Sequence, residues 1–238
     1  MKNTFSFITP FPDVINSYIS SSIMNKANEK GIVDYNILNL FEYGNSPHYK
    51  IDDYPFGGGD GMVLKPEPIF RAIDKLKVAI NSDNMRVVFP TPDGPLFSQD
   101  LAKELVEEQN IVFICGHYKG IDQRVRDNLV TDEISIGDFV ITGGELPSLI
   151  IADSIVRLIP DVIGEFKSAR TDSFYDSLLD GPHYTRPEEF RGMNVPDVLL
   201  SGNHKKIKDW FQRNREDKTK ERRKDLWKNY LTKLEDGV

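Results

Sequence analysis

Cysteine is almost absent from this chain, and an intrachain disulfide is excluded because Cys115 has no second cysteine to pair with. Such sparse cysteine usage is typical of reducing compartments, so we expect a cytoplasmic location. No apolar run approaches the roughly 20 residues that a membrane-spanning helix needs, and the N-terminus lacks the basic start and apolar stretch of a signal peptide. A membrane partner is therefore not expected.

Common nucleotide- and metal-binding motifs are also missing. The sequence has no phosphate loop of the form GxxxxGKS or GxxxxGKT, and its nearest approach to GxGxxG, the run GGGDGM at 57–62, follows no predicted strand and opens no predicted helix. The four histidines, His48, His117, His183 and His204, are scattered without the spacing of metal ligands. Walker-type, dinucleotide-type and zinc sites are therefore not predicted.

Charge is distributed unevenly along the chain. Residues 204–238 hold 12 Lys/Arg and 7 Asp/Glu, a net charge of +5, which leaves −12 on residues 1–203. An acidic body with a basic tail indicates a polyanion partner held at one end. A solvated helix face is the alternative, and charge alone favours it. Because aromatic residues interleave with the basic ones, we expect the tail to pack as helices; they are Trp210, Phe211, Trp227 and Tyr230.

Strand-like and helix-like segments alternate through the first two thirds of the chain, which predicts an α/β domain with a largely parallel sheet. The expected strands cover 4–11, 33–40, 86–89, 111–115 and 134–141, and the expected helices cover 13–30, 66–80, 98–108 and 145–157. Ligands of such sheets bind beyond the carboxyl ends of the strands. Three turn-rich loops follow predicted strands, so we expect the site there; they are PTPDGP, GHYKG and TGGELP.

The periodicity and composition of the sequence change near residue 162. Residues 162–178 show no sustained periodicity and have the composition of a linker, and two turn-rich segments then lead into the basic tail. We therefore expect a boundary near residue 162 and a small, mostly helical second domain after about residue 177.

The glycines of the loops indicate that main chain approaches a ligand closely, which suits an adenosine-like group. Cys115 ends an apolar run with no adjacent base, which favours a buried structural thiol over a nucleophile. On these grounds the sequence indicates an α/β enzyme or binding protein for an adenosine-containing ligand and a polyanion.

Five segments in order through nearly the whole chain resemble the bacterial tRNA (guanine-N1)-methyltransferase family of the SPOUT class. They are IDDYPFGGGDGM (51–62), CGHYKGIDQRV (115–125), SIGDFVITGGELP (135–147), LLDGPHYTRPE (178–188) and VPDVLLSGNH (195–204). The resemblance implies a knotted (deep trefoil) parallel-sheet SPOUT domain at 1–161, an interdomain linker at 162–177 and a small, mostly helical tRNA-binding domain at 178–238. It also implies a homodimer whose active site is shared between subunits.

By the same resemblance, the loops of the knot bind S-adenosylmethionine (SAM) as the methyl donor. Without the resemblance, a glycine pair after a strand is equally well explained as a tight turn. A magnesium requirement is implied too, but no ligand cluster is visible and its site is left unassigned. The implied cofactor residues are Thr91, Pro92, Gly116, Tyr118, Lys119, Ile136, Gly137, Asp138, Phe139, Val140, Ile141, Gly143, Gly144, Pro147 and Asp180.

The implied reaction methylates N1 of guanine 37, 3′ of the anticodon, in tRNA with guanines at positions 36 and 37. N1 of neutral guanine carries a proton, so a general base is needed, and Asp172 matches the family's proposed base. Arg157 matches the arginine that stabilises charge on O6. The alternatives are a helix N-cap for Asp172 and a helix C-terminal cation for Arg157. The implied tRNA contacts are His48, Asp52, Ser201, Asn203, His204, Arg222 and Arg223.

The chain departs from the family pattern at a few positions. Lys119 stands where the family usually has Glu, so we hypothesise that Asp180 contacts the ammonium of SAM while Lys119 faces the SAM carboxylate or the tRNA. Arg215 and Lys224 stand where serine and proline are common, and Pro90 replaces a residue whose main chain borders the adenine. A tRNA-binding protein that has lost methyl transfer and a SPOUT enzyme for another RNA position stay open as alternatives.

Overall fold

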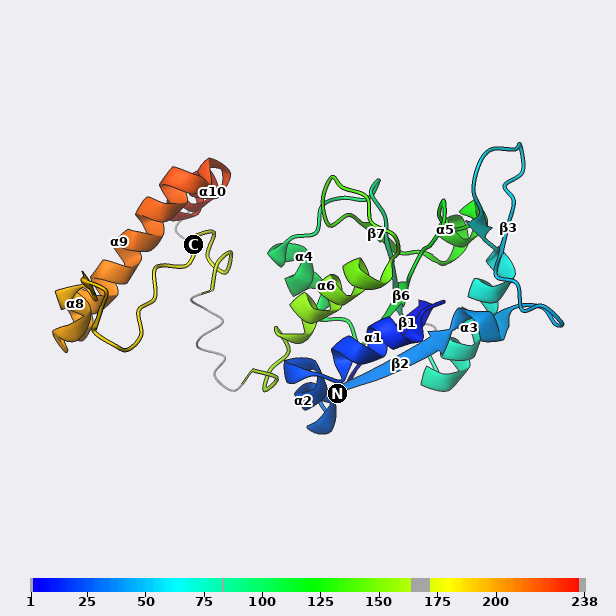
Figure 1. Cartoon of the computed structure of the whole chain (residues 1–238), viewed down its shortest axis with the longest axis horizontal. Helices are drawn as coiled ribbons and strands as arrows, with labels where there is room; N and C mark the ends of the chain where they lie inside the picture. Colours follow the sequence, from blue (N-terminus) through cyan, green and yellow to red (C-terminus); the bar gives the residue numbers. More distant parts are fainter. Residues whose placement is uncertain (1, 83, 164–171, 236–238) are drawn as a thin grey trace. The chain divides into compact units, whose positions relative to one another are not determined.

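The computed structural model describes residues 2–82, 84–163 and 172–235. Its contacts divide the chain into two units, Met1–Gly164 and Glu165–Val238, which are drawn in Figure 1. The predicted linker, 162–177, falls at this division, and its middle part, 164–171, lies outside the described residues. The roles expected for 1–161, 162–177 and 178–238 stay predictions.

Unit 1 is built on a five-stranded sheet in the order β2-β1-β6-β5-β7, and all four neighbouring pairs are parallel. This confirms the predicted α/β class with a parallel sheet. The strands are β1 (Asn3–Thr9), β2 (Val33–Asn39), β5 (Arg86–Pro90), β6 (Asn110–Ile114) and β7 (Asp132–Ile134).

The central strands are buried on both faces, so their side chains alternate between two cores. In β6, Ile111 and Phe113 belong to one core, and Val112 and Ile114 belong to the other. The ring of Phe113 stacks on that of Phe7 in β1, with centroids 5.1 Å apart. A strand that is covered on both sides needs apolar residues at successive positions, which explains the continuous apolar runs of the sequence.

Helices cover both faces of the sheet (Figure 1). The first core lies under α1 (Pro12–Ile19), α2 (Ser22–Glu29), α4 (Gln99–Leu105) and α6 (Glu145–Val156), and the second under α3 (Pro66–Ile80) and α5 (Gln123–Leu129). A 3-10 helix, η1 (Leu40–Tyr43), follows β2. The glycine-rich stretch at 44–61 contains β3 (Asp52–Asp53), which pairs antiparallel with β4 (Val63–Leu64).

Three elements differ from the sequence-based expectation. The stretch 13–30 forms two helices, because the chain turns at Ser22, whose φ is 49°. The strand expected at 134–141 ends at Ile134, and the apolar residues after it face the pocket described below instead of joining the sheet. Helix α5 was not expected, since Val125 is its only buried side chain and its apolar periodicity is weak.

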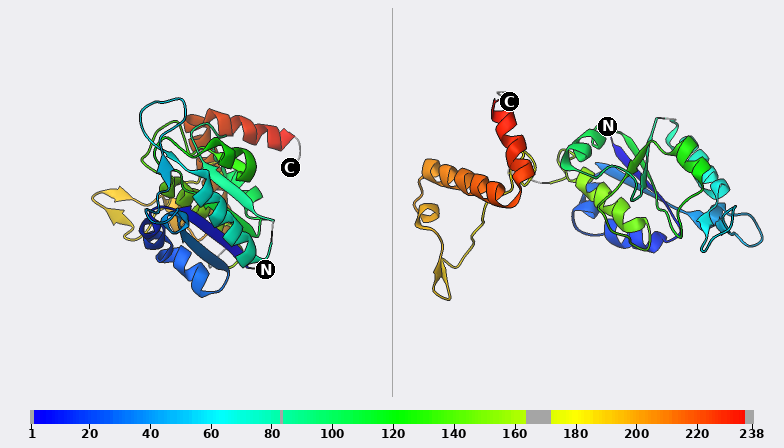
Figure 2. Two further views of the ribbon diagram at one scale, coloured as in Figure 1. Left: turned by 90° about the vertical axis from the view of Figure 1, so that its right-hand side faces the viewer. Right: turned by 90° about the horizontal axis from the view of Figure 1, so that it is seen from above.

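The described residues of unit 2 form a short hairpin and three helices. The hairpin pairs β8 (Glu189–Phe190) with β9 (Met193–Asn194), and α8 (Asp197–Leu200), α9 (His204–Arg222) and α10 (Lys224–Glu235) follow. The chain changes direction between α9 and α10 (Figure 2), and the Gln212 amide of α9 donates a hydrogen bond to the Tyr230 hydroxyl of α10 at 3.2 Å. The tail therefore packs as helices, as predicted.

A buried arginine ties the start of unit 2 to α9. Arg215 donates two hydrogen bonds to the Asp176 carboxylate, at 2.6 and 2.9 Å, and is 9% exposed. Beside it, the Leu179 N–H donates to the Thr219 hydroxyl at 2.8 Å. Arg215 is thus a structural residue of unit 2, because its guanidinium is buried against Asp176.

Candidate active site

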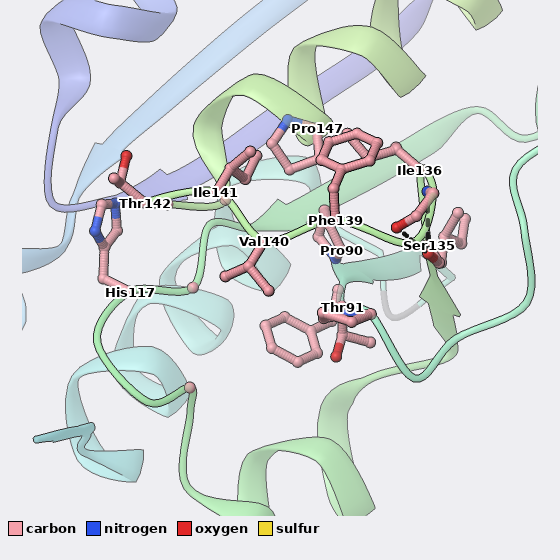
Figure 3. A pocket seen from close by; sticks show the side chains of 18 of the residues that line it. Pro90, Thr91, His117, Ser135, Ile136, Phe139, Val140, Ile141, Thr142 and Pro147 are labelled. Atoms are coloured by element: carbon pink, nitrogen blue, oxygen red, sulfur yellow. Dashed lines mark hydrogen bonds between the residues drawn. The ribbon is translucent and has the colours of Figure 1, made fainter. Parts of the chain in front are cut away.

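A pocket opens where β5, β6 and β7 end, as the position of the turn-rich loops predicted (Figure 3). Phe139, Ile136 and Pro147 lie on one side of it in this view, and Thr91 lies opposite them. The lining residues are Phe89, Pro90, Thr91, Pro92, Gly116, His117, Tyr118, Lys119, Gly120, Ile134, Ser135, Ile136, Gly137, Phe139, Val140, Ile141, Thr142, Gly143, Gly144 and Pro147.

The structure brings together all the predicted cofactor residues except two. Asp138 belongs to the same loop but does not line the pocket, and Asp180 belongs to unit 2. In unit 2 the Asp180 carboxylate accepts a hydrogen bond from the Gly181 N–H at 2.7 Å and lies 2.8 Å from His183 Nε2. The prediction missed several lining residues, and His117 is the one among them with an ionisable side chain. Its position inside the predicted loop GHYKG could have identified it from the sequence.

Glycine is required at two positions because two loops of the pocket touch. A Cβ at Gly144 would lie 2.5 Å from the Gly116 nitrogen and 2.7 Å from the Cys115 Cα, and the Gly144 N–H donates to the Gly116 carbonyl at 2.8 Å. A Cβ at Gly143 would lie 2.3 Å from His117 Cε1. Because Gly144 has a φ of −83°, lack of space, and not a special backbone conformation, is what demands glycine there.

Cys115 is a structural thiol, as the sequence predicted. It is 1% exposed, and its Sγ lies 3.5 Å from the Ser148 hydroxyl of α6. Burial, and after it the Glu145 carboxylate, raises the pKa of this thiol well above its usual range. A thiol that stays protonated at neutral pH is a poor nucleophile, so covalent catalysis through Cys115 is not supported.

The pocket loop at 116–120 is hydrogen-bonded to the β3-β4 hairpin. The Lys119 N–H donates to the Met62 carbonyl at 2.9 Å, and the Leu64 N–H donates to the Gly120 carbonyl at 3.0 Å. The stem of Lys119 lies along Gly61, where an added Cβ would be 3.0 Å from Lys119 Cγ. Desolvation, and then the charge of Asp52, raises the pKa of Tyr118. Asp52 of β3 is therefore close to the mouth of the pocket.

The pocket is suited to holding a ligand and offers little proton chemistry. Apolar side chains and main chain make up most of its lining, and the titratable lining groups within the described residues are His117, Tyr118 and Lys119. Within residues 2–82, 84–163 and 172–235, no three His, Cys, Asp or Glu side chains gather as ligands for a metal ion. Of the three titratable lining groups, His117 is engaged by Glu145, with Nε2 2.7 Å from Oε2.

The two predicted catalytic residues belong to different units. Arg157 caps the C-terminus of α6 in unit 1, which agrees with the expected helix-end position. Asp172 belongs to unit 2, where its carbonyl accepts from the Tyr175 N–H at 3.4 Å. Since no helix of the described residues begins at Asp172, the N-cap interpretation is not supported.

The predicted tRNA-binding residues fall into separate groups. His48 and Asp52 lie in unit 1, whereas Ser201, Asn203 and His204 lie at the junction of α8 and α9, where the Asn203 side chain accepts from the Lys206 N–H at 3.1 Å. Arg222 and Arg223 lie at the opposite end of α9, where Arg223 pairs with Asp225. The exposed cations between the two ends are Lys205, Lys206, Lys208, Arg213 and Lys220.

No helix within the described parts of the chain is long and apolar enough to cross a bilayer.

Comparison with known proteins agrees with the five sequence segments. The family model described as tRNA (guanine-1)-methyltransferase TrmD matches residues 3–229. The tRNA (guanine-N(1)-)-methyltransferase of Clostridioides difficile is 51% identical over 94% of this chain and 97% of its own length. Its counterparts in Bacillus velezensis and Staphylococcus carnosus are each 50% identical, over 94% and 97% of this chain and 92% and 93% of theirs. This chain belongs to the tRNA (guanine-1)-methyltransferase family.

Proposed function

We propose that this protein transfers the methyl group of SAM to N1 of guanine 37 in tRNA that carries guanines at positions 36 and 37. The observation that carries the proposal is the pocket, in which main chain from three strand-end loops surrounds one cavity in a member of this family. The Gly144 N–H donates to the Gly116 carbonyl at 2.8 Å, so main chain of two loops meets in the wall of this cavity.

The pocket fits an adenosine-containing cofactor. Adenine is read through its edge by hydrogen bonds to main chain, and only glycine allows that close approach. Phe139, Ile141 and Pro147 supply apolar walls that exclude water from the cofactor. SAM, when bound, supplies an electrophilic methyl group on its sulfonium sulfur. The role of the pocket is to hold and orient that group.

Asp172 and Arg157 are the proposed catalytic residues. Asp172 accepts the N1 proton of guanine as the methyl group arrives, and Arg157 stabilises the negative charge that develops on O6. The assignment of Arg157 is supported by its match to the family's arginine; Arg157 ends α6, about 15 Å along the helix from Pro147 of the first turn. No step passes through magnesium, because the described residues offer no cluster of ligands for it.

We further propose a trefoil knot and a homodimer with a shared active site. A knot is supported by the tight passage of the chain at Gly144 against Cys115 and Gly116. A dimer is supported by α6, which is apolar all round and leaves Leu146 57% and Ile150 49% exposed. The partner subunit would bring Asp172 to the pocket.

The neighbouring helix α1 extends the proposed dimer face. Phe11 precedes α1, and Phe11, Val14 and Tyr18 are exposed by 42–49%. Tyr18 lies beside Asp153 of α6, and burial followed by the charge of Asp153 raises the pKa of its hydroxyl. Exposed apolar side chains on two packed helices form one continuous patch, as the interfaces of homodimers do.

The basic surface of α9 is the proposed tRNA phosphate site. Its exposed lysines and arginines would displace counterions from the tRNA, so affinity should fall steeply with salt. The other proposed tRNA contacts are Ser201, Asn203 and His204 at the start of α9, Arg222 and Arg223 at its end, and His48 and Asp52 of unit 1, whereas Asp180 is proposed to contact the ammonium of SAM. A guanine taken out of its stack would reach the methyl donor.

Methyl transfer from radiolabelled SAM tests the proposed function. We expect incorporation into tRNA with guanines at 36 and 37, and loss of incorporation when guanine 37 is replaced. Absence of incorporation with both tRNAs would favour a tRNA-binding protein without activity. Equal incorporation with both would favour a SPOUT enzyme for another position.

Replacing Lys119 by glutamate tests which anion this pocket cation faces. Lys119 lies at the pocket rim, and no carboxylate lines the pocket among the described residues. We expect the Lys119→Glu variant to bind SAM or tRNA about fivefold more weakly, an effect limited by the solvent exposure of the side chain. Separate calorimetric titrations with each ligand identify the one that Lys119 contacts. Unchanged affinities for both would contradict a role in binding.

A further inference from the structure

A buried carboxylate lies directly behind the wall of the pocket and has no part in the proposed proton transfer. Glu145 is the first residue of α6 and is 5% exposed. Removing a carboxylate from water costs several kcal/mol unless hydrogen bonds replace the lost hydration. The surroundings of Glu145 therefore have to supply donors.

Two donors come from segments far apart in the sequence. The Thr9 hydroxyl at the end of β1 donates to Oε1 of Glu145 at 2.6 Å, and Nε2 of His117 lies 2.7 Å from Oε2. Thr9 is itself fixed, because its hydroxyl accepts from the Phe11 N–H at 2.9 Å and its side chain is fully buried. The Phe11 ring packs edge-on against the His117 ring, with centroids 4.8 Å apart. The Nε2–Oε2 contact therefore holds the His117 ring against the carboxylate.

The contacts meet at the main chain that lines the pocket. His117 follows Gly116, and Glu145 follows Gly143 and Gly144, so the His117–Glu145 contact joins the two loops that touch there. A Cβ at Gly143 would lie 2.7 Å from Oε2 of Glu145, which shows that this loop rests on the carboxylate.

We infer that Glu145 is a positioning residue for the methyl donor: its carboxylate joins the end of β1, the 116–118 loop and the first turn of α6, and so fixes the main-chain groups that bind SAM. This inference rests on the proposed function and goes beyond it, because Glu145 does not line the pocket. A binding site made of main chain cannot adjust by changing side-chain rotamers. Displacement of either loop by a fraction of an ångström therefore reaches the ligand directly.

Variants at both ends of this contact test the inference. We expect Glu145→Ala to raise the Kd and the KM for SAM by about tenfold or more, with a KM for tRNA within twofold of wild type. Glu145→Gln keeps an acceptor for Thr9 and a polar group for His117, and should recover most of the affinity. Thr9→Val removes one donor and should raise the Kd for SAM by about threefold.

A matched control separates positioning from general stability. Tyr35→Phe removes a half-buried hydroxyl that donates to the Met24 carbonyl at 3.3 Å, at the edge of the sheet away from the pocket. It should lower Tm without changing the Kd for SAM. The inference is overturned if Glu145→Ala binds SAM like wild type, or if Tyr35→Phe weakens SAM binding as much.

Two further readouts keep the test decisive. If Glu145→Ala does not fold, Thr9→Val decides, because an unchanged Kd for SAM in that variant contradicts the inference. Amide hydrogen exchange in the protein without ligand should accelerate at 116–118 and 143–145 in Glu145→Gln or Thr9→Val, and unchanged exchange in both would contradict the inference too. Failure of the wild-type protein to bind SAM would instead contradict the proposed function, and the exchange experiment would still test the positioning role.

Discussion

The Asp172→Asn variant is expected to lose methyl transfer by about 10²- to 10⁴-fold, the range that a general base contributes. Asparagine keeps the shape of the side chain but cannot take the N1 proton of guanine. Since Asp172 belongs to unit 2 and the pocket lies in unit 1, the Kd for SAM should stay within twofold of wild type. Single-turnover rates with saturating tRNA, together with calorimetry for SAM, measure both quantities.

Asp209→Asn is the matched control for this variant. Asp209 is an exposed acid of α9 that has no proposed role in the reaction, and its replacement should leave the single-turnover rate unchanged. A normal rate in Asp172→Asn would place the base elsewhere. Loss of SAM affinity in parallel with the rate would point to a structural role for Asp172.

The Gly144→Ala variant is expected to abolish measurable SAM binding. Its Cβ would lie 2.5 Å from the Gly116 nitrogen, and main-chain atoms cannot yield as a flexible side chain can. Either the two loops separate or the start of α6 shifts, and the unfolding free energy should fall by about 1–3 kcal/mol as in other overpacked sites. Calorimetry with SAM and urea unfolding test both effects.

Gly181→Ala controls for adding a methyl group at a glycine. A Cβ there meets its nearest atoms at 3.4–3.7 Å, which is ordinary contact, and Gly181 lies in unit 2. We expect it to bind SAM normally. If Gly144→Ala also bound SAM normally, the contact between the loops would not shape the cofactor site.

The two inactive variants together test whether the active site is shared between subunits. A mixed dimer of Asp172→Asn and Gly144→Ala subunits holds one site with an intact pocket and an intact base from the partner. Random mixing should therefore restore about a quarter of the wild-type rate in a symmetric dimer. An unrestored rate, in a mixture shown by mass to contain mixed dimers, would indicate that each pocket uses the Asp172 of its own chain.

The sequence predicted the helices, strands and loops that are determined by residues close together in the chain. Helix α3 was expected at 66–80 and spans Pro66–Ile80, because a proline opens it and Asn81 ends it in the left-handed conformation. Strand β6 was expected at 111–115, and the apolar side chains required by its two covered faces made it visible. The loops of the pocket were predicted too, since glycine clusters after strands are a local signal.

Features that depend on distant contacts were not predictable in this way. Val140 and Ile141 continue an apolar run and so indicated strand, whereas they line a pocket whose other walls lie at 89–92 and 116–120. Glu145 is an acidic residue in the first turn of a helix, which is common, and only the fold brings Thr9 and His117 to it. The burial of Arg215 was not predictable either, because nothing near it in the sequence reveals its contact with Asp176.

The ion pair between Arg215 and Asp176 also sets the reach of the proposed proton acceptor. Asp172 is four residues from Asp176, so a fully extended tether between them would span no more than about 14 Å. The volume that Asp172 can search is therefore centred on α9 and moves with it, however residues 164–171 are arranged. If tRNA binds on α9, Asp172 would move together with the tRNA. The proton acceptor and the target guanine would then reach the methyl donor at the same time.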